Sequence, residues 1–195
     1  MLKGFLVGLV VANGFEWIAH KYILHGTHRV GQPRFSCVPK SMQSHWEHHR
    51  EVRKQSFHDD GYVQGISNWR TKNEIVSLII VATVSGLIFY PLSKGMMCAA
   101  VYSAGNYYYI HRRAHLEPEW AKKAIPWHYD HHMNSNQDAN WCVTKPWFDY
   151  VMGTRFVSSS DLKEQNPLGL TLPQPIADWI SQRVEKYFPA KFIEK

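Results

Sequence analysis

The stretch Ile75-Val-Ser-Leu-Ile-Ile-Val-Ala-Thr-Val-Ser-Gly-Leu-Ile-Phe-Tyr-Pro-Leu92 contains 18 residues and no charged side chain. An α-helix rises about 1.5 Å per residue, so this run reaches about 27 Å, close to the hydrocarbon thickness of a bilayer. A short break that includes Lys94 separates it from a second uncharged run, Gly95–Ile110, which carries three tyrosines near its end. Because tyrosine is common at membrane interfaces, the two runs predict a membrane-spanning helical hairpin.

A further apolar stretch lies at the start of the chain. Leu2–Phe15 contains only Lys3 and Asn13 as strongly polar residues, and Gly4 and Gly8 are spaced four apart. Such spacing is found where membrane helices pack closely, but composition alone also explains it. We expect membrane helices at about 2–19, 75–92 and 95–110, the first being a full span or a partly inserted helix. A signal peptide and a soluble all-α protein are the alternatives.

Basic residues are unevenly distributed along the chain. Nine Lys and Arg lie within residues 20–73 and eleven lie from residue 111 onward, whereas the remaining segments hold only Lys3 and Lys94. By the positive-inside rule, both basic segments are cytoplasmic. We therefore predict a single domain over 1–195: an all-α integral membrane protein with two to three membrane helices and a cytoplasmic helical cap, residues 20–73 and 111–195. All histidines then lie on the cytoplasmic side.

Composition excludes several classes of protein. Apolar residues make up 45% and charged residues 19% of the chain, which excludes a disordered or fibrous protein. Cys37, Cys98 and Cys142 are scattered and form neither a disulfide framework nor a Cys-x-x-Cys zinc site. The formal net charge of +6 comes without a basic stripe or a stacking platform of aromatic residues, so we expect no nucleic acid partner.

Histidine is the unusual residue, and ten of the twelve fall into four clusters. On an α-helix, residues three and four apart share a face, so the second, third and fourth clusters each present their imidazoles in one direction. The first pair is five residues apart and requires a bend, a bulge or a helix end. Imidazole favours Zn, Fe, Cu and Ni, and ten ligands predict two ions with about five nitrogen ligands each. The clustered histidines are His20, His25, His45, His48, His49, His111, His115, His128, His131 and His132.

Three other side chains are candidates for a second layer around such ions. Glu47 and Asp130 lie inside clusters but off the histidine face, so we expect them to bind a ring N–H of a ligand or to be solvated. His58 is a further candidate for this layer or an ordinary loop histidine. The Glu-x-x-His pairs of soluble di-iron bundles are missing, and no cluster contains the cysteine of a zinc finger. A metal store or sensor is the alternative.

The order of the clusters, His-x4-His, His-x2-His-His, His-x3-His and His-x2-His-His, resembles that of the integral-membrane fatty acid hydroxylase superfamily. This superfamily includes fatty acid 2-hydroxylases and sterol desaturases. Glu16-Trp-Ile-Ala-His20-Lys-Tyr-Ile-Leu-His25 resembles its first histidine box. Trp147-Phe-Asp149-Tyr-Val-Met-Gly153-Thr154 resembles the segment after its last box, with one residue between Trp and Asp. The resemblance covers about residues 14–156; eukaryotic members are longer and some carry a cytochrome b5 domain.

The resemblance implies a non-haem di-iron centre held by the ten clustered histidines. It also implies an O2-dependent monooxygenase that hydroxylates a C–H bond of a lipid or other apolar substrate, a fatty acyl chain being favoured. A lipid or sterol desaturase with the same di-iron site is one alternative, and a non-redox zinc-binding membrane protein is another. Because the sequence holds no nucleotide- or cluster-binding motif, we expect a separate electron-donor protein of the cytochrome b5 or ferredoxin type.

The C-terminal part of the chain predicts one more helix. A loop rich in proline and glycine over 166–175 is followed by apolar residues at helical spacing, beginning with Ile176 and Trp179 and ending with Phe188. Arg183 and Lys186 lie between them. We expect this helix to pack on the cap; a helix lying on the membrane surface is the alternative.

Overall fold

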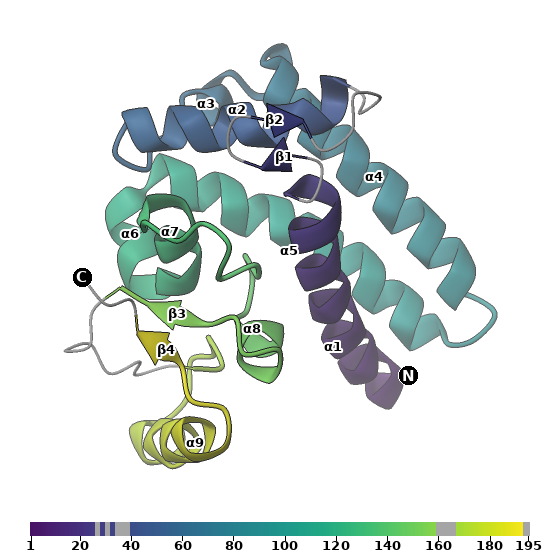
Figure 1. The fold of residues 1–195 in the computed structure, drawn as a ribbon. Coiled ribbons are helices and arrows are strands. Elements are labelled where there is room, and N and C mark those ends of the chain that lie inside the picture. The colour runs from purple at the N-terminus through teal and green to yellow at the C-terminus, as the bar shows by residue number, and fades with distance from the viewer. Residues whose placement is uncertain (26–27, 30–31, 34–39, 159–166, 193–195) are drawn as a thin grey trace.

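The computed structural model describes residues 1–25, 28–29, 32–33, 40–158 and 167–192 of the chain. The described part is mostly helical, as predicted, with two small two-stranded sheets. Three long helices extend from a group of short ones (Figure 1). The helices are α1 (Leu2–Ile18), α2 (Lys40–Lys54), α3 (Gly61–Gln64), α4 (Trp69–Phe89), α5 (Lys94–Leu116), α6 (Pro118–Ala124), α7 (Pro126–Met133), α8 (Trp147–Val151) and α9 (Gln174–Tyr187). The strands are β1 (His28–Arg29) antiparallel to β2 (Gln32–Pro33), and β3 (Phe156–Val157) parallel to β4 (Lys191–Phe192).

A π-helix over Ala19–Leu24 continues α1 without a break. Its hydrogen bonds join residues five apart, so a π-helix aligns two side chains that an α-helix would turn away from each other. The His25 backbone N–H donates to the His20 carbonyl oxygen at 3.0 Å, and the two imidazole ring centroids are 5.0 Å apart. Of the features predicted between these histidines, a bend, a bulge or a helix end, the structure has a bulge. Gly26, the next residue, lies outside the described part of the chain.

The predicted hairpin is formed by α4 and α5. Asn68 caps α4, because its Oδ1 accepts hydrogen bonds from the backbone N–H groups of Arg70 at 3.0 Å and Thr71 at 3.4 Å. Ser93 caps α5 in the same way, accepting from the Met96 N–H at 3.4 Å. The second helix is longer than expected: α5 continues beyond residue 110 to Leu116 and so carries the third histidine cluster.

Close packing of α1 on α5 depends on glycine. A methyl group added to Gly8 would lie 2.6 Å from the Ala99 Cβ, which leaves no room for a side chain. A methyl group on Gly95 would collide with the backbone of Met1 and Phe5. Together with Gly4, which faces Ser93, these glycines let the two helices approach closely.

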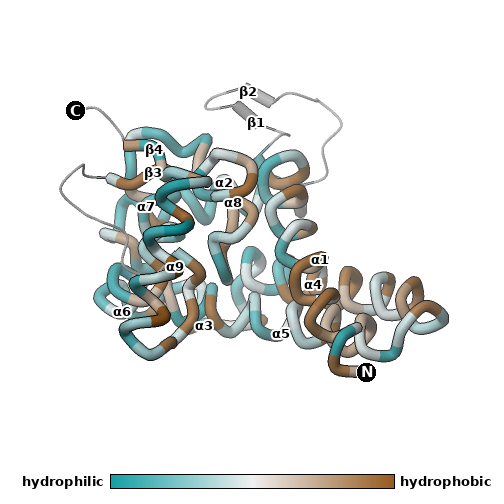
Figure 2. The backbone as a smooth tube through the Cα atoms, turned by 90° about the horizontal axis from the view of Figure 1, so that it is seen from below, coloured by the Kyte–Doolittle hydropathy of each residue, from teal (hydrophilic) through white to brown (hydrophobic). Residues whose placement is uncertain are grey.

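Two helical segments are long and apolar enough to cross a bilayer, Leu2–Leu24 and Trp69–Phe89. None of the apolar window of α4 is buried, and its Ile79 and Leu87 are 60% and 72% exposed. The core helix of a soluble protein would be mostly buried instead. Figure 2 shows hydrophobic residues gathered on the parts of α1, α4 and α5 that extend away from the short helices.

The short helices pack around two small cores. One contains Val52, Phe57, Ile125 and Trp127 between α2 and α7, and the other joins Trp17 of α1 to residues 141–142. The predicted C-terminal helix is present as α9, but the expected packing of its apolar face on the cap is wrong, because α9 contains no buried residue and Trp179 is 57% exposed.

Candidate metal centre

Five histidines from three parts of the chain bring their ring nitrogens to one point, which we call position A. His20 and His25 come from the π-helix and its end, His45 and His49 from α2, and His131 from α7. The Nε2 atom of His45 lies 3.0 Å from that of His25 and 3.1 Å from those of His20 and His49. The Nε2 atom of His131 completes the group, 3.2 Å from that of His25.

Four further histidines form position B beside it. His48 comes from α2, His111 and His115 from α5, and His132 from α7, and all four are buried. The Nε2 atoms of His48, His111 and His132 are buried without a hydrogen-bond partner. Rings of the two positions are in contact, since the centroids of His49 and His132 are 4.1 Å apart.

The structure thus gathers nine of the ten predicted ligands into two groups, within each of which the candidate ligand atoms lie no more than 4.8 Å apart. His128 belongs to neither group. It is fully buried next to position B, with its Nε2 atom 3.2 Å from that of His115. Two adjacent groups match the prediction of a dinuclear site, while the role of His128 as a ligand stays a prediction.

The arrangement of ring nitrogens fits metal ions better than hydrogen bonding. The Nδ1 atom of His20 donates to the Trp141 carbonyl at 2.5 Å, and that of His131 donates to the Ala139 carbonyl at 2.7 Å. A neutral imidazole has one N–H, so the Nε2 atoms of these two rings carry lone pairs. Converging lone pairs in a buried site repel one another unless a cation lies between them. The donor set therefore suits imidazole-binding transition metals.

Carboxylates hold two rings of position B. The Nδ1 atom of His48 lies 2.7 Å from Asp59 Oδ2, and that of His111 lies 2.6 Å from Glu74 Oε1. The third ring, His115, donates from Nδ1 to the Phe57 carbonyl at 2.9 Å. Such partners orient a ligand ring and leave its Nε2 free for metal.

Burial keeps these imidazoles neutral. It lowers the pKa of His131 to about 4 and moves the pKa values of His45, His48, His49 and His132 well below their ordinary value of 6.5. The cause is the same in each case, since a charged imidazolium loses its hydration inside the protein. Neutral imidazole is the form that binds metal, so these rings can bind a metal ion at neutral pH without first losing a proton.

The second layer includes carboxylates that the sequence prediction did not name. Asp130, which was predicted for this layer, is buried, and its Oδ2 lies 3.2 Å from Arg155 Nη1. Glu47 offers its backbone carbonyl to Arg70 Nη1 at 3.4 Å, and His58 pairs with Asp60 at 3.1 Å in an exposed position. The carboxylates that contact ligand rings, Asp59 and Glu74, were missed. Asp59 is next to His58, and Glu74 is the last charge before the apolar run that starts at Ile75.

The segment after the last histidine cluster fixes the loop that binds His20 of position A. Asp149 of α8 accepts hydrogen bonds from the backbone N–H groups of Trp141 at 2.8 Å and Cys142 at 2.9 Å and from Thr154 Oγ1 at 2.8 Å. It thereby fixes the loop whose Trp141 carbonyl binds His20. Gly153 has a φ of 63°, which favours glycine at this turn.

Glu16, from the first histidine box, fixes the same loop from α1. Its carboxylate accepts from the Thr144 N–H at 2.8 Å, from Thr144 Oγ1 at 2.7 Å and from the Val143 N–H.

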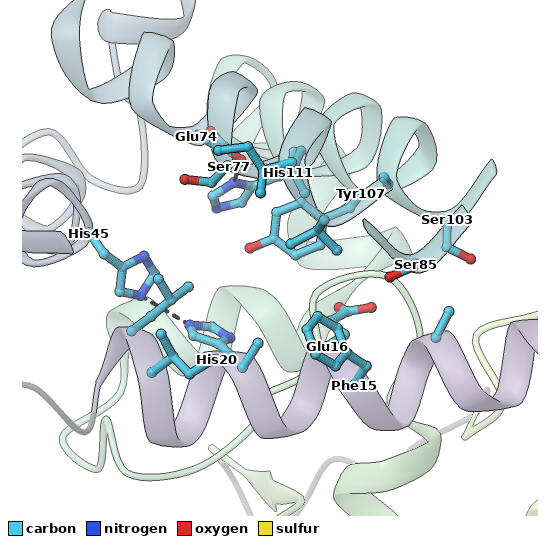
Figure 3. A pocket seen from close by; sticks show the side chains of 18 of the residues that line it. Phe15, Glu16, His20, His45, Glu74, Ser77, Ser85, Ser103, Tyr107 and His111 are labelled. Carbon is cyan, nitrogen blue, oxygen red and sulfur yellow. Dashed lines mark hydrogen bonds and ion pairs between the residues drawn. The ribbon is translucent and has the colours of Figure 1, made fainter. Parts of the chain in front are cut away.

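A cavity of about 570 Å³ lies between α1, α4 and α5 and ends at the histidines. His20 and His45 of position A and His48 and His111 of position B are among its lining residues. More than half of the remaining lining residues are apolar. The polar ones include the charged residues Glu16, Asp59, Arg70 and Glu74 and the small residues Ser77, Ser85 and Ser103. In Figure 3, Tyr107 projects from α5 into this space between His111 and Glu16. A ligand in the cavity would reach both positions at one end.

Basic side chains near the histidine clusters are engaged within the protein. Arg53 of α2 donates from Nη1 to the carbonyls of His132 at 2.7 Å and Asn134 at 3.0 Å, so it supports α7. Arg113 and Lys122 pair with Glu117 and Glu119 on the surface.

The fold and site define a mostly helical protein with a candidate dinuclear histidine metal centre. The chain matches no family model, no curated protein and no solved structure. The assignment of a function therefore depends on the site itself.

Proposed function

We propose that this chain is an integral membrane non-haem di-iron monooxygenase that uses O2 to hydroxylate a C–H bond of an apolar lipid, with a fatty acyl chain as substrate. The observation that carries the proposal is the contact between positions A and B and the apolar cavity, which share His20, His45, His48 and His111. A purely structural metal site needs no such cavity.

The membrane would enclose the outer parts of the three long helices. α4 exposes its apolar window completely, which suits contact with lipid chains. The apolar end of the cavity lies between the same helices, so an acyl chain can enter from the bilayer without crossing water. The uneven distribution of Lys and Arg supports a cytoplasmic location for the histidines.

Two bound iron ions would supply the activation of O2 and the removal of hydrogen from an unreactive C–H bond. The protein positions the ligands, supplies charged groups behind them and excludes water from the site. The nine grouped histidines present ring nitrogens, Asp59 and Glu74 orient two of the rings, and the apolar cavity walls exclude water and hold the acyl chain near the site. Zinc can occupy such a site in isolated protein.

The overall reaction needs an outside source of electrons. The balance is R–H + O2 + 2 electrons + 2 protons giving R–OH and water, so one oxygen atom enters the substrate and the other is reduced. The electron donor in this proposal is a separate protein of the cytochrome b5 or ferredoxin type.

Lipid mass spectrometry tests the proposal. Membranes from cells that express the chain with an electron donor would be compared with membranes that contain the His131→Ala variant at equal abundance. His131 is buried at the centre of position A, so the variant should lose activity. An acyl chain one oxygen atom heavier, present only with the unchanged protein, supports the proposal.

Two other results would contradict it. A product two hydrogens lighter would identify a desaturase with the same site. Purified protein that binds zinc in preference to iron, and that yields no oxidised lipid after iron loading and electron supply, would favour a non-redox metal protein.

A further inference from the structure

The two metal positions differ in the charge of the groups behind their ligands. At position A, the described partners of the Nδ1 atoms are neutral carbonyl oxygens, those of Trp141 for His20 and Ala139 for His131. At position B, two of the four rings contact carboxylates, Asp59 and Glu74. Among the residues that the structure describes, position A has five imidazoles and no such carboxylate, while position B has four imidazoles and two carboxylates.

This difference affects how well each position tolerates a doubly charged ion. Both positions are buried, so water does little to compensate an added positive charge. A further neutral imidazole adds a donor but leaves the net charge of the site unchanged. A carboxylate hydrogen-bonded to a ligand ring lowers that net charge and makes the imidazole a stronger donor.

Glu74 carries more of this effect than Asp59. Asp59 is already balanced, since its Oδ1 lies 2.8 Å from Arg70 Nη2 and also accepts from the Gly61 N–H at 2.8 Å. Glu74 has a neutral neighbour instead: the Tyr62 hydroxyl donates to its Oε2 at 2.6 Å. Its charge therefore stays available to the ring of His111.

We infer that the two positions are filled in order, position B first, and that Glu74, assisted by Asp59, is the positioning residue that sets this order. The inference rests on the metal-binding part of the proposed function. A chain with one ion per molecule would then hold it at position B, and chelation would empty position A first.

The experiment is a titration of metal-free, detergent-solubilised protein with Co2+, followed by visible absorption and by the number of ions retained after gel filtration. We expect two steps of unequal affinity. The His25→Ala variant, which changes only position A, should lose the weaker step, and His132→Ala, which changes position B, should lose the tighter one. These variants assign each step to a position.

The Glu74→Gln variant then tests whether the Glu74 carboxylate is the reason that position B binds more tightly. Glutamine keeps the size and one acceptor oxygen but removes the charge, so the tighter step should weaken by about 10- to 100-fold while the weaker step stays unchanged. Asp59→Asn should weaken the same step to a smaller extent. The matched control is Asp60→Asn, at the residue after Asp59. The Asp60 carboxylate is exposed and contacts only His58 among the residues described, so this variant should leave both binding steps unchanged.

Three outcomes would overturn the inference: Glu74→Gln weakening only the position A step, Glu74→Gln leaving both steps unchanged, or His132→Ala removing the weaker step. Circular dichroism of each variant separates these outcomes from unfolding. The readout is metal binding rather than turnover. Ordered binding in a protein that oxidises no lipid would therefore leave this inference standing while the proposed function fails.

Discussion

At the scale of single residues, Asp149 connects the segment after the last histidine cluster to the metal centre. It is completely buried, and its three hydrogen bonds hold the backbone of residues 141–142 and the side chain of Thr154. Thr154 in turn accepts from the indole N–H of Trp17 at 2.9 Å. A single carboxylate thus joins α8, the loop behind His20 and the end of α1.

Asp149 makes stability depend on pH in a defined direction. Burial raises its pKa from 3.8 to about 6, so between these values the native state holds a proton that the unfolded chain has lost. Its contribution to the free energy of unfolding should therefore fall by about 3 kcal/mol as the pH rises from about 4 to about 6, and stay constant above. The measurement is chemical unfolding in detergent of the unchanged protein and Asp149→Asn at several pH values.

The difference between these two proteins isolates the residue, because all their other titratable groups are the same. The stability of the unchanged protein minus that of the variant should fall by about 3 kcal/mol with rising pH, to zero or below. Asn also places an N–H₂ against the backbone N–H groups that the carboxylate bound, which should lower stability by about 1–3 kcal/mol at low pH. A difference that does not vary with pH would contradict the assignment.

A second residue, Ala104, tests whether the length of the cavity limits the length of the acyl chain that it accepts. It lines the cavity on α5, seven residues before His111 and so about 10 Å along the helix from it. Ala104→Phe should reduce kcat/KM for long acyl chains by about 10-fold and spare shorter ones. The neighbouring Gly105→Phe points to open space and should leave chain-length preference unchanged. Equal losses in the two variants would exclude an acyl ligand at this level of the cavity.

At the scale of helices, the approach of α1 to α5 determines where the first histidine pair lies. Gly8→Leu would force the helices apart, because the Cβ position already meets Ala99 and Met96. We expect a loss of about 1–3 kcal/mol, as for other overpacked interfaces. Gly105→Leu lies on α5, where an added side chain meets no atom within 4 Å, and it should not lower stability. Thermal unfolding of the two variants in one detergent measures both effects, and equal stabilities would mean that the interface is not tightly packed.

The helices show which features the sequence could predict. Two uncharged runs predicted the hairpin, and helical spacing predicted the faces of the histidine clusters, because these features depend on residues close together in the chain. The spacing of His20 and His25 required a bend, a bulge or a helix end, and a π-helix is present. The second layer could not be predicted in the same way: Asp59 meets His48 and Glu74 meets His111 only after α2, α4 and α5 have packed. The exposed face of α9 was missed for the same reason, since spacing marks an apolar face without showing what covers it.

At the scale of the whole molecule, the histidines join segments that begin at residue 20 and end at residue 132. Bound metal would therefore crosslink α2, α5, α7 and the end of α1, and its binding energy would add to the stability of the fold. Removing metal with a chelator should lower the thermal midpoint of the unchanged protein. The same treatment should change His131→Ala less, because that variant lacks a central contact of position A. Equal shifts would show that the stabilising metal lies elsewhere.

The proposed orientation of the molecule in a membrane rests on its charge distribution and can be tested with two exposed lysines. Lys94 begins α5 at the tip of the hairpin, and Lys123 lies on α6 near the histidines. In a chain whose native cysteines are replaced, Lys94→Cys should react with an impermeant maleimide in intact cells, and Lys123→Cys only after permeabilisation. The reverse pattern would place the metal centre outside, where a cytoplasmic electron donor cannot reach it. Labelling of both cysteines in intact cells would show that the hairpin does not span the membrane. An acyl chain would then have to reach the cavity through water.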